Sequence, residues 1–139
     1  LDNVEITAFS TNHSDPTAMG FRFKFPRYII SYTGDTKLTP ELLANLDGTQ
    51  FLILNVPFPG NKSDGLNLDS ASALKIISII KPKIAVLTHF NLDMLRADPL
   101  NESREIQRAT GVPTIAARDG LVIVPENYST LTNNVKGFS

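Results

Sequence analysis

The chain has 139 residues, of which 42% are hydrophobic and 19% charged, a composition typical of one globular domain and not of a disordered chain. Its net charge is −1 with acidic and basic residues interspersed, so a nucleic acid would need a partner surface or a metal to bind. The absence of cysteine excludes disulfides, zinc-thiolate sites and cysteine nucleophiles, which leaves histidine and carboxylate side chains as metal ligands.

The sequence also suggests where the protein is located in the cell and where its folded unit begins and ends. No apolar run reaches the roughly eighteen residues of a membrane span and no leader-like segment opens the chain, so we expect a cytoplasmic protein without membrane contact. The chain begins at Leu1 and enters a strand-like segment at once, which suggests a processed, truncated or split product. We expect a folded unit over residues 1–125 and a loose or partner-dependent tail over residues 126–139, which has no periodic pattern.

The first elements in chain order are strands. Residues 4–9 alternate between hydrophobic and polar side chains, and residues 20–25 repeat the pattern. A Pro-Arg pair then leads into an apolar segment over residues 28–32. Residues 20–33 therefore predict a hairpin whose second strand ends at a Gly-Asp-Thr segment that contains Asp35.

Helices and strands alternate over the rest of the chain. We expect helices over residues 40–46, 70–80, 92–96 and 101–110, strands over 51–54, 83–88, 114–116 and 121–124, and a long loop over 55–67 that forms a lid or rim. This alternation predicts an α/β fold with helices packed on a sheet. Loops at the carboxyl ends of strands carry the chemistry in such sheets, and both Asp35 and His89 fall at strand ends.

Three side chains are candidate metal ligands, and each has an ordinary alternative. His13 lies among turn-forming residues, where a surface histidine is the commoner case. Asp35 could cap the turn that follows it, and His89 could be a structural histidine with a hydrogen-bond partner. Together, two imidazoles and one carboxylate are enough to hold zinc, manganese or iron weakly, but they are too few for a two-metal centre.

Several segments occur in an order that resembles a known family. They are TNHSDPTAMGFRF, IISYTGDT, LILN, KPKIAVLTHF, REIQRATGV and IAARDG. From residue 4 to residue 124 the chain resembles the C-terminal half of metallo-β-lactamase-superfamily hydrolases, nearest to archaeal predicted metal-dependent hydrolases and more distantly to tRNA 3′-processing endonucleases. The resemblance implies the second half of an αββα sandwich, with a mixed sheet and helices on one face.

The resemblance also implies roles for individual residues. His13 corresponds to a ligand of one metal, Asp35 to the catalytic bridge between two metals, and His89 to a ligand of the other. Thr88 and Asp119 look like supporting positions, Asp119 as a hydrogen-bond partner of a ligand imidazole, with a plain turn aspartate as the alternative.

The sequence departs from the family in two respects. The His-x-His-x-Asp-His loop, which supplies most of the other ligands, lies upstream of the matched segments and is absent. Many relatives also have a histidine just before the segment that begins here at Gly65, where it assists the leaving group, and this chain has none there. We therefore expect this chain to be inactive alone, and the source of the acid step stays open.

Two functions follow as hypotheses. The first is half of a dinuclear hydrolase with two divalent ions, zinc being the first candidate, that cleaves a phosphodiester or related ester once an N-terminal half from the same parent or a separate chain completes it. The second is a non-catalytic binding or scaffold module. An enzyme half is expected to expose an apolar sheet face and form homo-oligomers or aggregate alone, whereas a self-sufficient module is expected to be monomeric.

Overall fold

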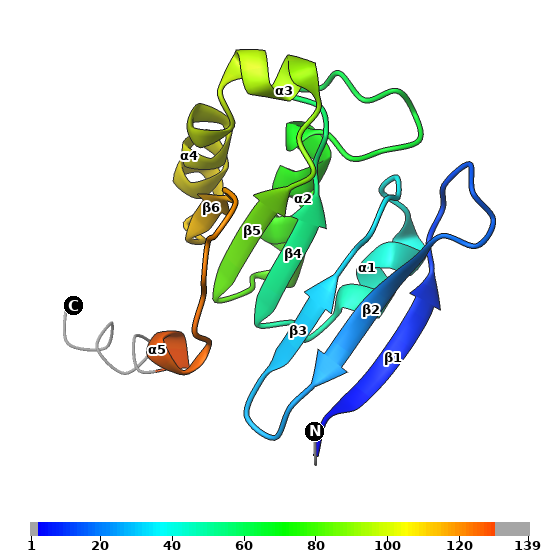
Figure 1. Ribbon diagram of the computed structural model, residues 1–139, viewed down its shortest axis with the longest axis vertical. Helices are drawn as coiled ribbons and strands as arrows, with labels where there is room; N and C mark the ends of the chain where they lie inside the picture. Colours follow the sequence, from blue (N-terminus) through cyan, green and yellow to red (C-terminus); the bar gives the residue numbers. More distant parts are fainter. Residues whose placement is uncertain (1–2, 130–139) are drawn as a thin grey trace.

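The strands of the computed structural model, which describes residues 3–129, form one six-stranded sheet (Figure 1). Their order in the sheet is their order in the chain: β1 (Glu5–Ser10), β2 (Met19–Lys24), β3 (Ile29–Tyr32), β4 (Phe51–Asn55), β5 (Ile84–Thr88) and β6 (Thr114–Ala116). The helices are α1 (Pro40–Leu46), α2 (Ser70–Ile80), α3 (Leu92–Ala97), α4 (Pro99–Thr110) and α5 (Glu126–Ser129). Within the described range, no helix is long and apolar enough to span a membrane.

The sheet is mixed, and the direction of each pair follows from its connection. β1, β2 and β3 form an antiparallel meander, which confirms the predicted hairpin. From β3 to β6 each neighbouring pair is parallel, because the connections between these strands contain α1, α2, or α3 and α4. The carboxyl ends of β3, β4 and β5 therefore lie along one edge of the sheet, toward which their arrows point in Figure 1. We call this edge the carboxyl edge.

The hydrophobic core lies between one face of the sheet and the helices. Side chains from β4 and β5 that point to this face pack against side chains from α1, α2 and α4; among these fully or almost fully buried residues are Leu46, Leu52, Leu54, Ile76, Ile77, Ala85, Leu87 and Ile106. Figure 1 shows α1 and α2 behind the strands. The predicted α/β fold with helices on one face of a mixed sheet is confirmed.

The opposite face of the sheet is also apolar. One row across β1 to β5 is made by residues that are paired in register: Ile6, Phe23, Ile30, Phe51 and Ile84. The segment after β6 covers the row at β3, β4 and β5, since Ile123 and Pro125 line a groove with Ile30, Phe51 and Ile84. At the β1 end, Ile6 remains 56% exposed. We call this surface the second sheet face.

The prediction of a strand over residues 121–124 is wrong. The segment has the composition of a strand, but it pairs with no other strand among residues 3–129. A strand needs a neighbour for its backbone hydrogen bonds. The chain instead turns at Arg118 to Leu121, whose N–H donates to the Arg118 carbonyl over 3.0 Å, and then leaves the sheet edge.

Two further boundaries differ from the sequence prediction. α4 begins at Pro99 and not at Asn101, because the Asp98 carboxylate caps it by accepting the Leu100 N–H at 3.0 Å. In the predicted tail, residues Glu126–Ser129 form the short helix α5. The remainder of that tail, residues 130–139, lies outside the described residues.

Candidate functional site

Asp35 and His89 meet at the carboxyl edge of the sheet. Asp35 follows β3, His89 follows β5, and their side chains approach each other past the end of β4, with His89 Nε2 at 3.4 Å from Asp35 Oδ1. The two side chains are 34% and 57% exposed, respectively. The pair is therefore open to solvent and to a solute, as a binding site requires.

Asn55, the last residue of β4, lies beneath this pair and is only 4% exposed. Its Nδ2 donates to Asp35 Oδ1 at 2.9 Å and to the Tyr32 hydroxyl at 3.0 Å. Its Oδ1 is buried and has no hydrogen-bond partner among residues 3–129. Asp35 is thus held from below by the strand that lies between its own strand and that of His89.

The backbone conformations at Gly34 and His89 set the directions of the Asp35 and His89 side chains. Gly34 has φ +60°, and a Cβ there would lie 2.6 Å from the Met19 carbonyl oxygen, so only glycine fits this turn. The Asp35 carbonyl accepts the Thr11 hydroxyl at 2.9 Å, which ties the turn to the loop after β1. His89 itself has φ +64°, a left-handed conformation that costs energy for a residue with a Cβ.

His13 lies in the loop after β1 and contacts a different partner. Its Nδ1 is 3.2 Å from the Leu66 carbonyl oxygen in the loop between β4 and α2. Within the described part of the chain, no group of three or more histidine and carboxylate side chains is placed to hold a metal. The structure therefore brings Asp35 and His89 together without His13, and the metal-binding role of all three stays a prediction.

The two supporting positions lie at the end of β5 and in the turn after β6. Thr88 ends β5, and its carbonyl accepts the Val56 N–H at 2.9 Å, which extends the pairing with β4 by one residue. Asp119 lies in the exposed turn after β6. No hydrogen bond between Asp119 and His13 or His89 is present in residues 3–129, so its supporting role is also still a prediction.

The loop between β4 and α2 has its own internal order. Asp64 Oδ1 accepts the N–H groups of Leu66 and Asn67, both at 2.9 Å. These hydrogen bonds, that of Leu66 first, hold the pKa of the Asp64 carboxyl below its usual value against the opposing effect of desolvation. The predicted rim is thus folded on itself beside His13.

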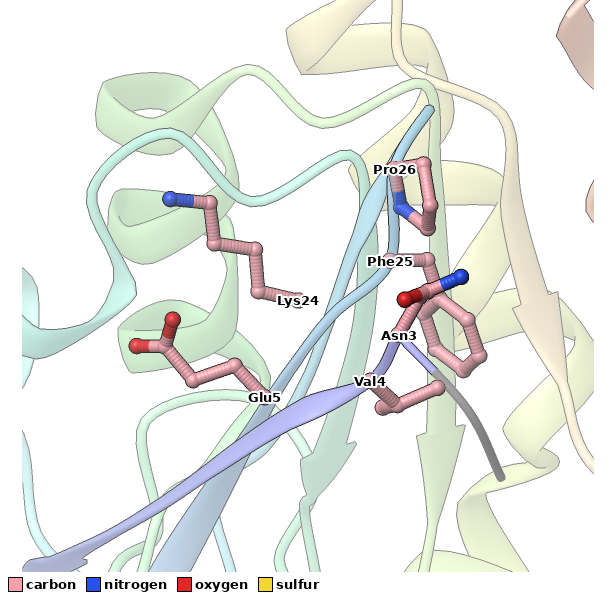
Figure 2. A pocket seen from close by; sticks show the side chains of 6 residues that line it. All are labelled: Asn3, Val4, Glu5, Lys24, Phe25 and Pro26. Carbon is pink, nitrogen blue, oxygen red and sulfur yellow. The ribbon is translucent and has the colours of Figure 1, made fainter.

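The hollow in Figure 2 lies far from this site. It is lined by Asn3, Val4, Glu5, Lys24, Phe25 and Pro26, where β1 begins and β2 ends. Because β2 is antiparallel to β3, the end of β2 lies beside the start of β3, opposite the carboxyl edge. Figure 2 shows the Glu5 and Lys24 side chains extending to the same side from neighbouring strands.

Tyr32 and Asn55 were missed by the sequence prediction. The rule that selected Asp35 and His89, a polar residue at the end of an apolar strand, also applies to Asn55 in the segment Leu-Ile-Leu-Asn. No comparable signal marks Tyr32, because an aromatic residue inside a strand is ordinary.

Comparison with known sequences identifies relatives over most of the chain. Residues 1–90 match the family described as "Beta-lactamase superfamily domain". The chain is 33% identical over 125 residues to the uncharacterized protein MJ1374 of Methanocaldococcus jannaschii, covering 88% of this chain and 46% of that protein. It is 32% identical over 107 residues to a UPF0173 metal-dependent hydrolase of Carboxydothermus hydrogenoformans, covering 76% of this chain and 45% of that protein. The chain thus spans less than half the length of these relatives.

Solved structures share the fold. The metallo-β-lactamase fold protein YhfI of Bacillus subtilis is similar with a TM-score of 0.75 and 18% identity, over 85% of this chain and 48% of that chain. Human tRNase Z, short form, is similar with a TM-score of 0.66 and 17% identity, over 89% of this chain and 44% of that chain. At these identities the likeness concerns the fold alone, and it agrees with the fold class expected from the sequence.

Proposed function

Because this chain belongs to the β-lactamase superfamily, we propose that it forms half of a metal-dependent hydrolase whose site is completed by ligands from outside the chain. The observation that carries this proposal is the approach of Asp35 and His89 at the carboxyl edge, with 3.4 Å between Oδ1 and Nε2. A carboxylate and an imidazole at this spacing are chemically suited to one divalent ion.

The described residues fit a metal only in part. Zinc sites take four ligands in a structural site and three protein ligands plus water in a catalytic one, whereas Asp35 and His89 supply two. His13 would add a ligand through Nε2, because its contact with the Leu66 carbonyl uses only Nδ1. The remaining ligands would come from the part of the relatives' length that this chain does not span. When bound, such an ion supplies an activated water and stabilises developing negative charge.

Within this proposal, the chain's own residues bind and orient. Asp35 and His89 hold the ion, and the hydrogen bond from Asn55 fixes the Asp35 carboxylate. Thr88 and Asp119 would support the ligands from the ends of β5 and β6. The loop between β4 and α2 would form one wall of the entrance, since it contacts the His13 ring.

A phosphodiester or a related ester is the proposed substrate class. It is supported by the likeness of the fold to that of human tRNase Z, a ribonuclease by name. The net charge of −1 indicates that a nucleic acid, if it is the substrate, would be held mainly by surfaces outside this chain.

The second sheet face supports the proposed partner. An apolar row runs in register across five strands, and the segment after β6 covers only part of it. Exposed apolar surfaces of this kind mark interfaces. We infer that an N-terminal half of the same fold buries this face in the complete protein, and that the isolated chain associates with itself.

A non-catalytic module is the second candidate function. It is favoured by the absence of a three-ligand group within residues 3–129. In such a module, the contact between Asp35 and His89 would be a polar interaction of the sheet edge without a metal.

Metal content separates the two functions. The chain is loaded with zinc and, separately, with manganese, passed through gel filtration and measured by mass spectrometry, beside His89→Ala and His13→Ala variants. The hydrolase proposal expects metal in the wild type and its loss in His89→Ala, while His13→Ala tests the third ligand. Equal metal content in the wild type and the His89→Ala variant would favour the module, whereas no metal in either would mean that this chain alone does not hold the ion.

A further inference from the structure

Asn55 makes contacts that packing alone does not explain. It is the last residue of strand β4 and is almost fully buried, and both hydrogen bonds of its side chain are donated by Nδ2, to Asp35 and to Tyr32. The acceptor oxygen of the same amide is buried without a partner among residues 3–129. An unpaired buried acceptor lowers stability, so an apolar side chain of similar size would serve packing better.

The chemistry of the amide determines what Asn55 does to Asp35. An amide NH₂ group has two N–H donors, and here one is directed to each oxygen. The Tyr32 hydroxyl accepts one N–H, and Asp35 Oδ1 accepts the other. An aspartate at this position would instead place a second negative charge 2.9 Å from that oxygen.

The two oxygens of Asp35 are therefore not equivalent. Oδ1 is contacted by Asn55 Nδ2 at 2.9 Å and by His89 Nε2 at 3.4 Å. Oδ2 has no hydrogen-bond partner in the described range of the chain. With the Asp35 carbonyl anchored by Thr11, rotation of the carboxylate is limited at both ends of the residue.

We propose that Asn55 is a positioning residue, which holds the Asp35 carboxylate through Oδ1 in the orientation that binds a divalent cation beside His89. This inference rests on the proposed function, because it assumes that Asp35 is a metal ligand. Hydrogen-bond partners of metal ligands orient the ligand and typically change metal affinity tenfold to a hundredfold when removed.

The test is a Co²⁺ titration of the full chain, followed by visible absorbance, which reports affinity and coordination geometry together. Asn55→Leu removes both donors and the unpaired acceptor while nearly keeping the volume. Tyr32→Phe is the matched control, because it removes the other partner of the same amide and leaves the bond to Asp35. Asp35→Asn gives the level of binding without the ligand carboxylate. Thermal unfolding of each variant shows whether it is folded.

We expect Asn55→Leu to bind Co²⁺ about tenfold to a hundredfold more weakly at an unchanged or higher unfolding midpoint, and Tyr32→Phe to bind as the wild type does. A purely structural role would instead lower the midpoint and leave the affinity unchanged. If the Leu variant does not fold, Asn55→Ser, whose shorter side chain does not reach Oδ1, is judged by the same affinity criterion.

Two results would contradict the proposal in different ways. Wild-type affinity in a folded Asn55→Leu variant would overturn the positioning role and leave Asp35 as a ligand. Co²⁺ binding that is absent from the wild type, or unchanged in Asp35→Asn, would overturn Asp35 as a ligand in this chain and the role of Asn55 with it.

Discussion

His89 places its imidazole on a backbone with φ +64°, a conformation that suits glycine better than any residue with a Cβ. Such strain persists where the surroundings hold it, and it is concentrated at functional sites. Here the strain lies at the residue that meets Asp35, so the site and the local cost in stability coincide.

Replacing His89 tests this cost directly. His89→Gly removes the strained Cβ and is expected to be more stable than His89→Ala by about 1 kcal/mol, because Ala keeps the Cβ at the same φ. Urea unfolding of the two variants and the wild type measures the difference. A Gly variant that is no more stable than the Ala variant would show that the backbone relaxes once the imidazole is gone.

Asp64 gives the loop beside His13 a pH dependence. Its folded pKa is lowered, first by the hydrogen bond from the Leu66 N–H, so its contribution to loop stability is present above the unfolded value of about 4. That contribution is lost as the pH falls through the lower folded pKa. We expect the amide chemical shifts of Leu66 and Asn67 to titrate below pH ~4 in NMR spectra. The same transition in Asp64→Ala would assign it to another group.

At the scale of elements, the capping residues of α2 and α3 accept different numbers of hydrogen bonds. Asp69 caps α2 by accepting the Ser72 N–H at 2.8 Å, and its second oxygen accepts the Ser63 N–H of the preceding loop at 3.0 Å. Asn91 caps α3 with one bond, from the Met94 N–H at 2.8 Å. Asp69 is almost fully buried, so its two bonds are shielded from water.

Because the two caps differ, we expect their removal to lower the free energy of unfolding by different amounts. Asp69→Ala is expected to lower the free energy of unfolding by about 2 kcal/mol or more, since it removes a cap and a loop anchor together. Asn91→Ala, the control, is expected to lower it by about 1 kcal/mol. Urea unfolding compares them, and equal losses would mean that the Ser63 bond adds nothing to the stability of the fold.

The elements that the sequence predicted best are those with local signals. Thr39 and Pro40 mark the start of α1, and the structure has the helix at the predicted residues because the Thr39 hydroxyl accepts the Leu42 N–H. The hairpin of β2 and β3 followed from alternation. The strand predicted over residues 121–124 was wrong, because composition does not show whether a neighbouring strand is present to pair with it.

In the candidate site, too, only the features with a signal in the sequence could be predicted. The placement of Asp35 and His89 at one edge was predictable, because parallel strands end together. Their contact past the end of β4, and the bond of Asn55 to Asp35, depend on side-chain directions that no local pattern encodes. The contact of His13 with Leu66 joins residues 53 positions apart, for which the sequence offers no signal.

At the scale of the whole molecule, the two faces of the sheet are covered by different parts of the chain. The helices bury the side chains of β4 and β5 that point to one face of the sheet. Residues 123–128 cover part of the other face. Ile6 at the β1 end is well exposed, and it lies in register with the apolar row.

Self-association through this face is open to a matched test. We expect the wild type to form oligomers and Ile6→Lys to shift them toward monomer, because a charge would be buried in the contact. Ile79→Lys is the control, since Ile79 is 58% exposed but lies on α2, on the helical side of the sheet. Sedimentation velocity over a range of concentrations measures the shift. A monomeric wild type, or equal shifts in both variants, would contradict self-association through the second sheet face.

The parallel order of β3, β4 and β5 also bears on how the molecule folds. The antiparallel meander of β1 to β3 closes through short, local connections, whereas each parallel pairing has to await a crossover that brings distant segments together. Asp35, Asn55 and His89 each follow or end a different strand of the parallel part. A chain that has formed only its meander thus holds Asp35 without either partner, and the site is complete only when both crossovers that place β4 and β5 have formed.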